Sequence, residues 1–111
     1  MQQRRVPRPV VTLGVSRAAT LDVALEGEID FGNSPQILEE VRAAVLKRRP
    51  ALVRVDLALV TYADSSALGM LVKLVEVATE VSASLRVENP SPAILRVMHI
   101  TGLTNLFGLG D

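Results

Sequence analysis

The order of strand-like and helix-like segments constrains the fold of this chain most. Strands are expected at 10–15, 21–26, 52–57 and 84–88. Helices are expected from Asn33 or Ser34 to about Arg49, from about Ser65 to Ser82, and from Ser91 to Gly102. Strand–helix–strand units pair in parallel through right-handed crossovers, whereas the short link at 16–20 permits an antiparallel hairpin. The sequence therefore predicts an α/β fold, a mixed β-sheet with an N-terminal hairpin and helices packed on the sheet, in the order β-β-α-β-α-β-α.

Composition limits the class of protein that this fold can be. The 111 residues suit one domain, expected at 10–111 after a flexible N-terminal tail at 1–9. Twelve basic residues balance twelve acidic ones, which argues against a broad surface for nucleic acid. The chain has no cysteine and no apolar run near the roughly 20 residues that span a bilayer. The simplest inference is a cytoplasmic protein without a membrane span or a direct nucleic-acid partner.

The stretch TYADSSALGM places polar side chains between a buried strand and an apolar helix. Such a loop, at the carboxyl end of a parallel strand, is where α/β proteins put their sites. Asp64 is suited to cap the helix, and Ser65 and Ser66 then fall in its first turn near the surface. Capping chemistry alone would also explain these three residues.

Helical spacing separates the two sides of this second helix. The core side is formed by Leu68, Leu71, Leu74, Val75 and Ala78. Ser66 and Lys73 lie on the opposite, polar side, and Gly69 lies at its edge. Glycine inside a helix costs about 1 kcal/mol relative to alanine, but it lets another backbone approach closely. Met70 and Val77 flank the same face, so we expect this face to contact a partner.

Four segments together resemble a known family. They are LEGEID (25–30), LVRVDL (52–57), DSSALGML (64–71) and SPAILRVMHITGL (91–103). In order and spacing they resemble the STAS domain of bacterial anti-sigma factor antagonists. The resemblance covers most of the chain and departs from the family at Ala67, where many members have glycine.

The resemblance implies a function and a set of site residues. Ser65 matches the serine that a partner, an anti-sigma factor with serine-kinase activity, phosphorylates. Unmodified, the helix face around this serine would dock on the anti-sigma factor, which then releases its sigma factor. The phosphate would add about −1.5 to −2 charges and break binding. The partner-binding residues expected are Asp64, Ser66, Gly69, Met70, Lys73, Glu28 and Asp30, with no catalytic residue, metal or cofactor.

Three alternatives remain open on the sequence. A STAS accessory or scaffold subunit of a transport system or stress-signalling complex would use the same face without a switch. Glu28 and Asp30 could form an acid–base pair or a metal site, although no third ligand is evident. A Ser65–His99 hydrolase pair would need both residues at one edge of the sheet, whereas successive crossover helices predict opposite edges. A homodimer is allowed but not required.

Overall fold

The computed structural model describes residues 10–17 and 19–110, so the predicted tail at 1–9 lies outside the described residues. Four strands form one sheet in the order β1-β2-β3-β4. They are β1 (Val11–Arg17), β2 (Thr20–Ile29), β3 (Leu52–Ala63) and β4 (Ser84–Glu88). β1 is antiparallel to β2, while β2, β3 and β4 are parallel to one another. The predicted mixed sheet with an N-terminal hairpin is confirmed.

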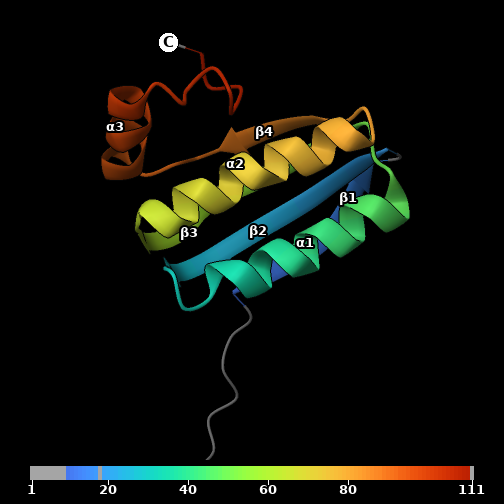
Figure 1. Cartoon of the computed structure of the whole chain (residues 1–111), viewed down its shortest axis with the longest axis horizontal. Coiled ribbons are helices and arrows are strands. Elements are labelled where there is room, and N and C mark those ends of the chain that lie inside the picture. Colours follow the sequence, from blue (N-terminus) through green and yellow to red (C-terminus); the bar gives the residue numbers. More distant parts are fainter. Residues whose placement is uncertain (1–9, 18, 111) are drawn as a thin grey trace, which may run out of the picture.

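Two helices, α1 (Ser34–Arg48) and α2 (Ser65–Glu80), lie side by side on one face of the sheet (Figure 1). The buried side chains alternate along the strands, with Leu21, Val23 and Leu25 on β2 and Val53, Val55 and Leu57 on β3. They form one cluster with the inner faces of both helices. Aliphatic side chains at period two and period 3.6 thus build the core without a tryptophan, as the composition predicted.

β3 is longer than the sequence predicted. The expected strand ended at Leu57, but pairing with β2 resumes after an irregularity between Asp56 and Leu59 and continues to Ala63. The Asp56 Oδ1 atom accepts a hydrogen bond from the Ala58 N–H at 2.9 Å, which satisfies the backbone where the ladder is interrupted. As a result β3 ends at Ala63, and only Asp64 separates it from the start of α2 at Ser65.

The third helix, α3 (Pro92–Thr101), begins and ends as predicted. The Ser91 hydroxyl accepts from the Ile94 N–H at 3.2 Å, and Gly102 ends the helix in the left-handed conformation with φ 75°. Its placement differs from expectation, because Figure 1 shows α3 at the end of the sheet where α2 begins. The expectation that His99 and Ser65 lie at opposite edges assumed that α3 runs along the sheet as α2 does, whereas α3 lies across the end of the sheet. No hydrogen bond joins their side chains within residues 19–110.

The segment after α3 docks on the edge of the sheet. Phe107 is fully buried, and its carbonyl accepts a hydrogen bond from the Val87 N–H of β4 at 2.8 Å. The sequence left open a last strand or a docked tail, and the structure shows turns at 104–108. The docked tail therefore covers the outer edge of β4, which would otherwise present unpaired backbone groups.

Candidate functional site

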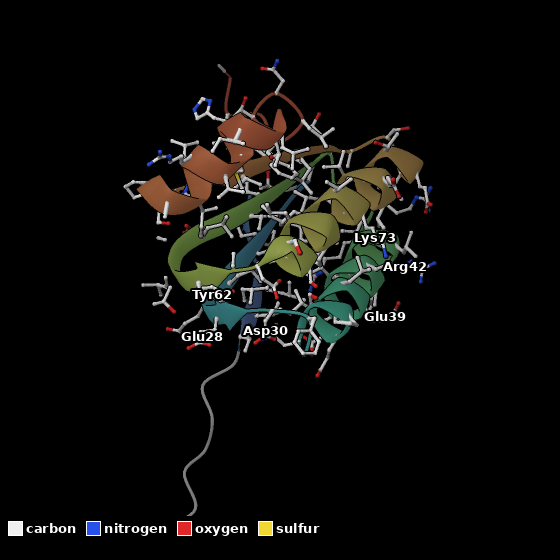
Figure 2. All side chains as sticks on the ribbon, turned by 60° about the vertical axis from the view of Figure 1, so that its left-hand side comes forward. Glu28, Asp30, Glu39, Arg42, Tyr62 and Lys73 are labelled. Carbon is white, nitrogen blue, oxygen red and sulfur yellow. The ribbon has the colours of Figure 1, made fainter. Side chains whose placement is uncertain are left out.

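The carboxyl ends of β2 and β3 bring the two polar segments of the sequence together. Glu28 pairs with Tyr62, and Ile29 pairs with Ala63, so the acidic segment lies beside the DSS segment. The Asp64 N–H also donates to the Ile29 carbonyl at 3.2 Å. Figure 2 shows Glu28, Asp30 and Tyr62 gathered at this end of the sheet. The topology therefore brings the polar residues together at the carboxyl edge, where the sequence predicted a site.

The Asp64 carboxylate ties α2 to the loop that follows β2. Its Oδ1 atom accepts from the Ala67 N–H at 3.1 Å, which caps the helix, and its Oδ2 atom accepts from the Phe31 N–H at 3.2 Å. Both oxygens are therefore engaged by backbone donors of the chain itself. The predicted cap is confirmed, and the second bond gives Asp64 a positioning role for the loop.

Removing this carboxylate should destabilise the fold measurably. Asp64→Ala leaves the first turn of α2 uncapped and frees the loop, so we expect a loss of about 1–2 kcal/mol in the free energy of unfolding. Urea denaturation followed by circular dichroism measures it. Asp64→Asn, which keeps a side-chain acceptor at the cap, should lose less than half as much. Equal losses for the two variants would contradict the capping role.

The loop between β2 and α1 is held by a small hydrogen-bond network. Asp30 Oδ1 accepts from the Gly32 N–H at 2.9 Å and from the Asn33 N–H at 3.3 Å. Asn33 in turn accepts from the Asp30 N–H at 2.9 Å and donates to the Glu28 carbonyl at 2.8 Å. Asn33 thus occupies the cap position of α1, but its side chain makes no cap hydrogen bond. The network shapes the loop instead.

This network helps to decide whether Glu28 and Asp30 form an acid–base pair or a metal site. One oxygen of Asp30 serves the backbone of its own loop, while Glu28 is exposed at the surface. In the part of the chain that the structure describes, no cluster of three or more metal-ligating side chains occurs. The pair is best described as one loop-shaping acid and one exposed acid at the rim of the site.

Ser65 stands at the first position of α2 and is exposed, as the sequence predicted. No hydrogen bond to its side chain is present within residues 19–110. Ser66, one residue further on, is half-buried. Of the two neighbouring hydroxyls, Ser65 is therefore the more accessible to another protein.

A groove runs between the start of α1 and α2, close to Ser65. Its volume is about 390 Å³, and we call it the α1/α2 groove. It is lined by Phe31, Ser34, Pro35 and Leu38 on one side and by Ser66, Gly69, Met70 and Lys73 on the other. Four of the predicted partner-binding residues therefore meet in one concave surface.

Met70 does not lie where the sequence placed it. Its side chain is 4% exposed and that of Val77 is 7% exposed, so neither offers the open apolar surface that we expected beside the partner-binding face. The reason is that α1 packs beside α2 and covers the flank on which both residues lie. The structure instead places Met70 in the wall of the α1/α2 groove.

Gly69 is exposed, and nothing among the described residues requires a glycine there. A Cβ atom built at this position would meet no heavy atom within 4 Å, and the residue has no positive φ. Neither a backbone conformation nor intramolecular packing explains the glycine. A close approach by another molecule would explain it.

Phe31 is a further candidate residue that was not predicted from the sequence. Its side chain is 78% exposed at the tip of the loop, at one end of the α1/α2 groove. The available signal was its rarity, because the chain has only two phenylalanines and this one lies in a polar segment beside the acidic pair. An exposed aromatic side chain beside a groove is typical of a binding surface.

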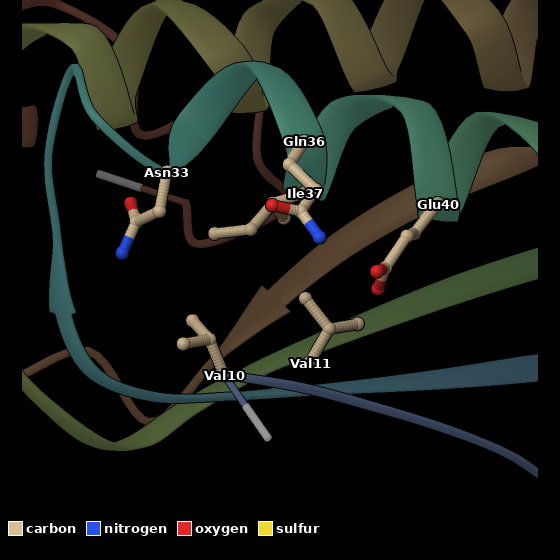
Figure 3. Close-up of a pocket in the computed structure, with 6 residues that line it drawn as sticks. All are labelled: Val10, Val11, Asn33, Gln36, Ile37 and Glu40. Atoms are coloured by element: carbon tan, nitrogen blue, oxygen red, sulfur yellow. The ribbon is translucent and has the colours of Figure 1, made fainter. Parts of the chain in front are cut away.

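A second hollow, between β1 and α1, has a volume of about 190 Å³ (Figure 3). It is lined by Val10, Val11, Asn33, Gln36, Ile37 and Glu40. None of the predicted site residues lines it. In a separate finding, no helix among the described residues is long and apolar enough to cross a membrane.

Comparison with known proteins gives consistent matches. The family model described as Mlab, STAS domain, matches residues 14–109. The anti-sigma-B factor antagonist of Bacillus subtilis (strain 168) is 32% identical over 89 residues, which cover 80% of each chain. A STAS-domain containing protein of Pseudomonas aeruginosa (strain UCBPP-PA14) is 35% identical over 88 residues, or 78% of this chain and 84% of the relative. The crystal structure of an anti-sigma factor antagonist from Mycobacterium paratuberculosis superposes with a TM-score of 0.76 at 26% identity, covering 91% of this chain and 84% of that one.

Proposed function

This chain belongs to the STAS domain family, and from that premise we propose that it is an anti-sigma factor antagonist switched at Ser65. In the unphosphorylated state it binds an anti-sigma factor with serine-kinase activity, which then releases its sigma factor. Phosphorylation of Ser65 ends the binding. The observation that carries the proposal is an accessible hydroxyl at the first position of α2, next to a groove with an exposed aromatic side chain.

The electrostatics of the site support a switch that spares the fold. A phosphate at a helix N-terminus is favoured by the helix dipole, so α2 should accept it without unfolding. The acids nearby, Asp64 and Asp30, carry the same sign of charge as a phosphate and would repel it. A partner docked over Ser65 would have to desolvate about −1.5 to −2 charges, which opposes binding.

Phosphosite mapping tests the proposal. The full chain is incubated with ATP and, one at a time, with purified serine-kinase anti-sigma factors encoded in the same genome, and the product is digested for mass spectrometry. We expect one phosphate, at Ser65, which Ser65→Ala abolishes and Ser66→Ala leaves in place. No phosphorylation by any of them, or a phosphate at Ser66, would refute the assignment.

Gly69 offers a test in which stability and binding change in opposite directions. Gly69→Ala should stabilise the fold by about 0.5–1 kcal/mol, because its Cβ meets nothing within 4 Å and glycine is a poor helix former. The same methyl group should weaken anti-sigma binding by about tenfold, because it occupies the space left for the partner. Thermal denaturation and calorimetric titration measure the two effects. A stabilised variant that binds as well as wild type would show that Gly69 is not part of the interface.

A STAS module without a switch is the second candidate. The matching family model is described as Mlab, STAS domain, and does not itself name an anti-sigma role. An accessory subunit of a transport or stress-signalling assembly would use the same groove constitutively. Partner binding that Ser65→Asp leaves unchanged would favour it. In either role the chain acts by binding in the cytoplasm and needs no enzyme activity, metal or cofactor of its own.

A further inference from the structure

The α1/α2 groove has a chemistry that specifies what it binds, and this inference rests on the proposed function. We propose that the groove receives an amphipathic segment of the anti-sigma factor. That segment places an apolar side chain over Gly69 and, about one helical turn further along α2, a carboxylate that pairs with Lys73. The groove therefore fixes both the class of segment and its direction along α2.

The apolar part of the recognition surface lies at the end of the groove near Ser65. Phe31 is 78% exposed there, Leu38 is partly exposed, and the buried Met70 lines the wall of the groove. Gly69 lines the same groove, and its backbone carries no side chain that would fill the space. A single exposed phenylalanine is common on protein surfaces and does not by itself indicate a binding site. Phe31, however, lines a concave surface that also contains Gly69, and such a surface can bind an apolar side chain of a partner.

The charged part lies at the other end of the groove. Lys73 is exposed, and within residues 19–110 it forms no ion pair. Figure 2 shows Lys73 on the same side of the molecule as Arg42 and Glu39, which α1 contributes. Arg42 and Glu39 also form no ion pair within the described residues, and Lys73 is the charged residue that lines the groove. The far end of the groove therefore favours a negative group of the partner.

Spacing along α2 relates the two parts. Gly69 and Lys73 are four residues apart, which is about 6 Å along a helix axis and about one turn. A helix that lies in the groove and carries an apolar residue and an acid three or four positions apart satisfies both contacts. Glu28 and Asp30 lie toward the Ser65 end of the site, so the reverse orientation would place the acid of the partner among like charges.

Charge reversal at Lys73 tests the inference against a matched control. The measurement is calorimetric titration of the full chain with the anti-sigma factor that phosphorylates Ser65. We expect Lys73→Glu to weaken binding by about 10- to 100-fold, and Phe31→Ala by a similar factor. Lys47→Glu makes the same charge change on an exposed residue of α1 that does not line the groove, and we expect a change below about twofold.

Salt dependence adds a readout that misfolding would not produce. The Debye length falls from about 10 Å at 0.1 M salt to about 3 Å at 1 M, so the deficit of Lys73→Glu should shrink as salt rises, whereas that of Phe31→Ala should persist. If wild type binds while Lys73→Glu and Lys47→Glu bind equally well, the inference fails and the proposed function stands. If wild type binds no serine-kinase anti-sigma factor, the proposed function fails and the inference fails with it.

Discussion

Phosphorylation of Ser65 is expected to weaken binding to the anti-sigma factor by about 100-fold or more, while the free energy of unfolding changes by less than about 1 kcal/mol. A 100-fold change corresponds to about 2.7 kcal/mol, which is within the cost of desolvating a doubly charged group in a protein interface. The fold should be insensitive because the hydroxyl is exposed and the phosphate would lie at the favourable end of the α2 dipole.

Three variants separate charge from loss of the hydroxyl. Ser65→Asp should reproduce most of the loss of binding, and Ser65→Ala should bind within a few-fold of wild type because it adds no charge. Ser66→Asp is the neighbouring control for stability, since Ser66 is half-buried and a charge there should disturb folding more than one at Ser65. Titration calorimetry gives the affinities and thermal denaturation the stabilities. A phosphorylated chain that binds as tightly as the unmodified chain would contradict the switch.

Phe107→Ala is expected to destabilise the chain by about 3–5 kcal/mol, the largest effect of a single substitution that we foresee. Phe107 is fully buried and has the largest volume among the fully buried side chains. Its removal leaves a cavity and loosens the tail, whose Phe107 carbonyl accepts from the Val87 N–H of β4. A loss of this size is a large part of the 5–15 kcal/mol that stabilises a typical domain.

Urea denaturation of Phe107→Ala and of the neighbouring variant Leu106→Ala measures this effect. Leu106 belongs to the same turn but is 41% exposed, so its truncation should cost less than about 1 kcal/mol. Nearly equal losses at the two positions would show that the tail is not anchored through Phe107. The expected contrast would establish that the last described segment belongs to the folded domain.

Most of the fold followed from local patterns in the sequence. Alternating aliphatic residues at Leu21, Val23 and Leu25 marked the central strand, and the proline at the start of α1 and the Ser91–Pro92 pair marked two helix starts. These signals are local, because capping and strand periodicity depend on neighbouring residues. Capping and helical spacing also placed Ser65 and Gly69 at the surface of α2, and both are exposed in the structure.

The features that the sequence did not predict depend on contacts between distant segments. Met70 is buried because α1 packs against its side of α2, and helical spacing alone does not identify which neighbour covers which flank. β3 continues past the irregularity at Asp56, where the Asp56 side chain accepts a hydrogen bond from the Ala58 N–H. Propensity scales do not include such a side-chain-to-backbone bond. Likewise, the bond from the Phe31 N–H to Asp64 joins residues 33 positions apart, so the groove beside Phe31 became visible only in the folded chain.

The most direct test of the account is release of a sigma factor from its complex with the anti-sigma factor. The preformed complex is mixed with the unmodified chain or with the chain phosphorylated at Ser65, and free sigma factor is followed by the fluorescence anisotropy of a labelled sigma factor. The account predicts that the unmodified chain releases the sigma factor in a concentration-dependent way and that the phosphorylated chain requires about 100-fold more protein for the same release. Equal release by the two forms, or no release by either, would contradict it.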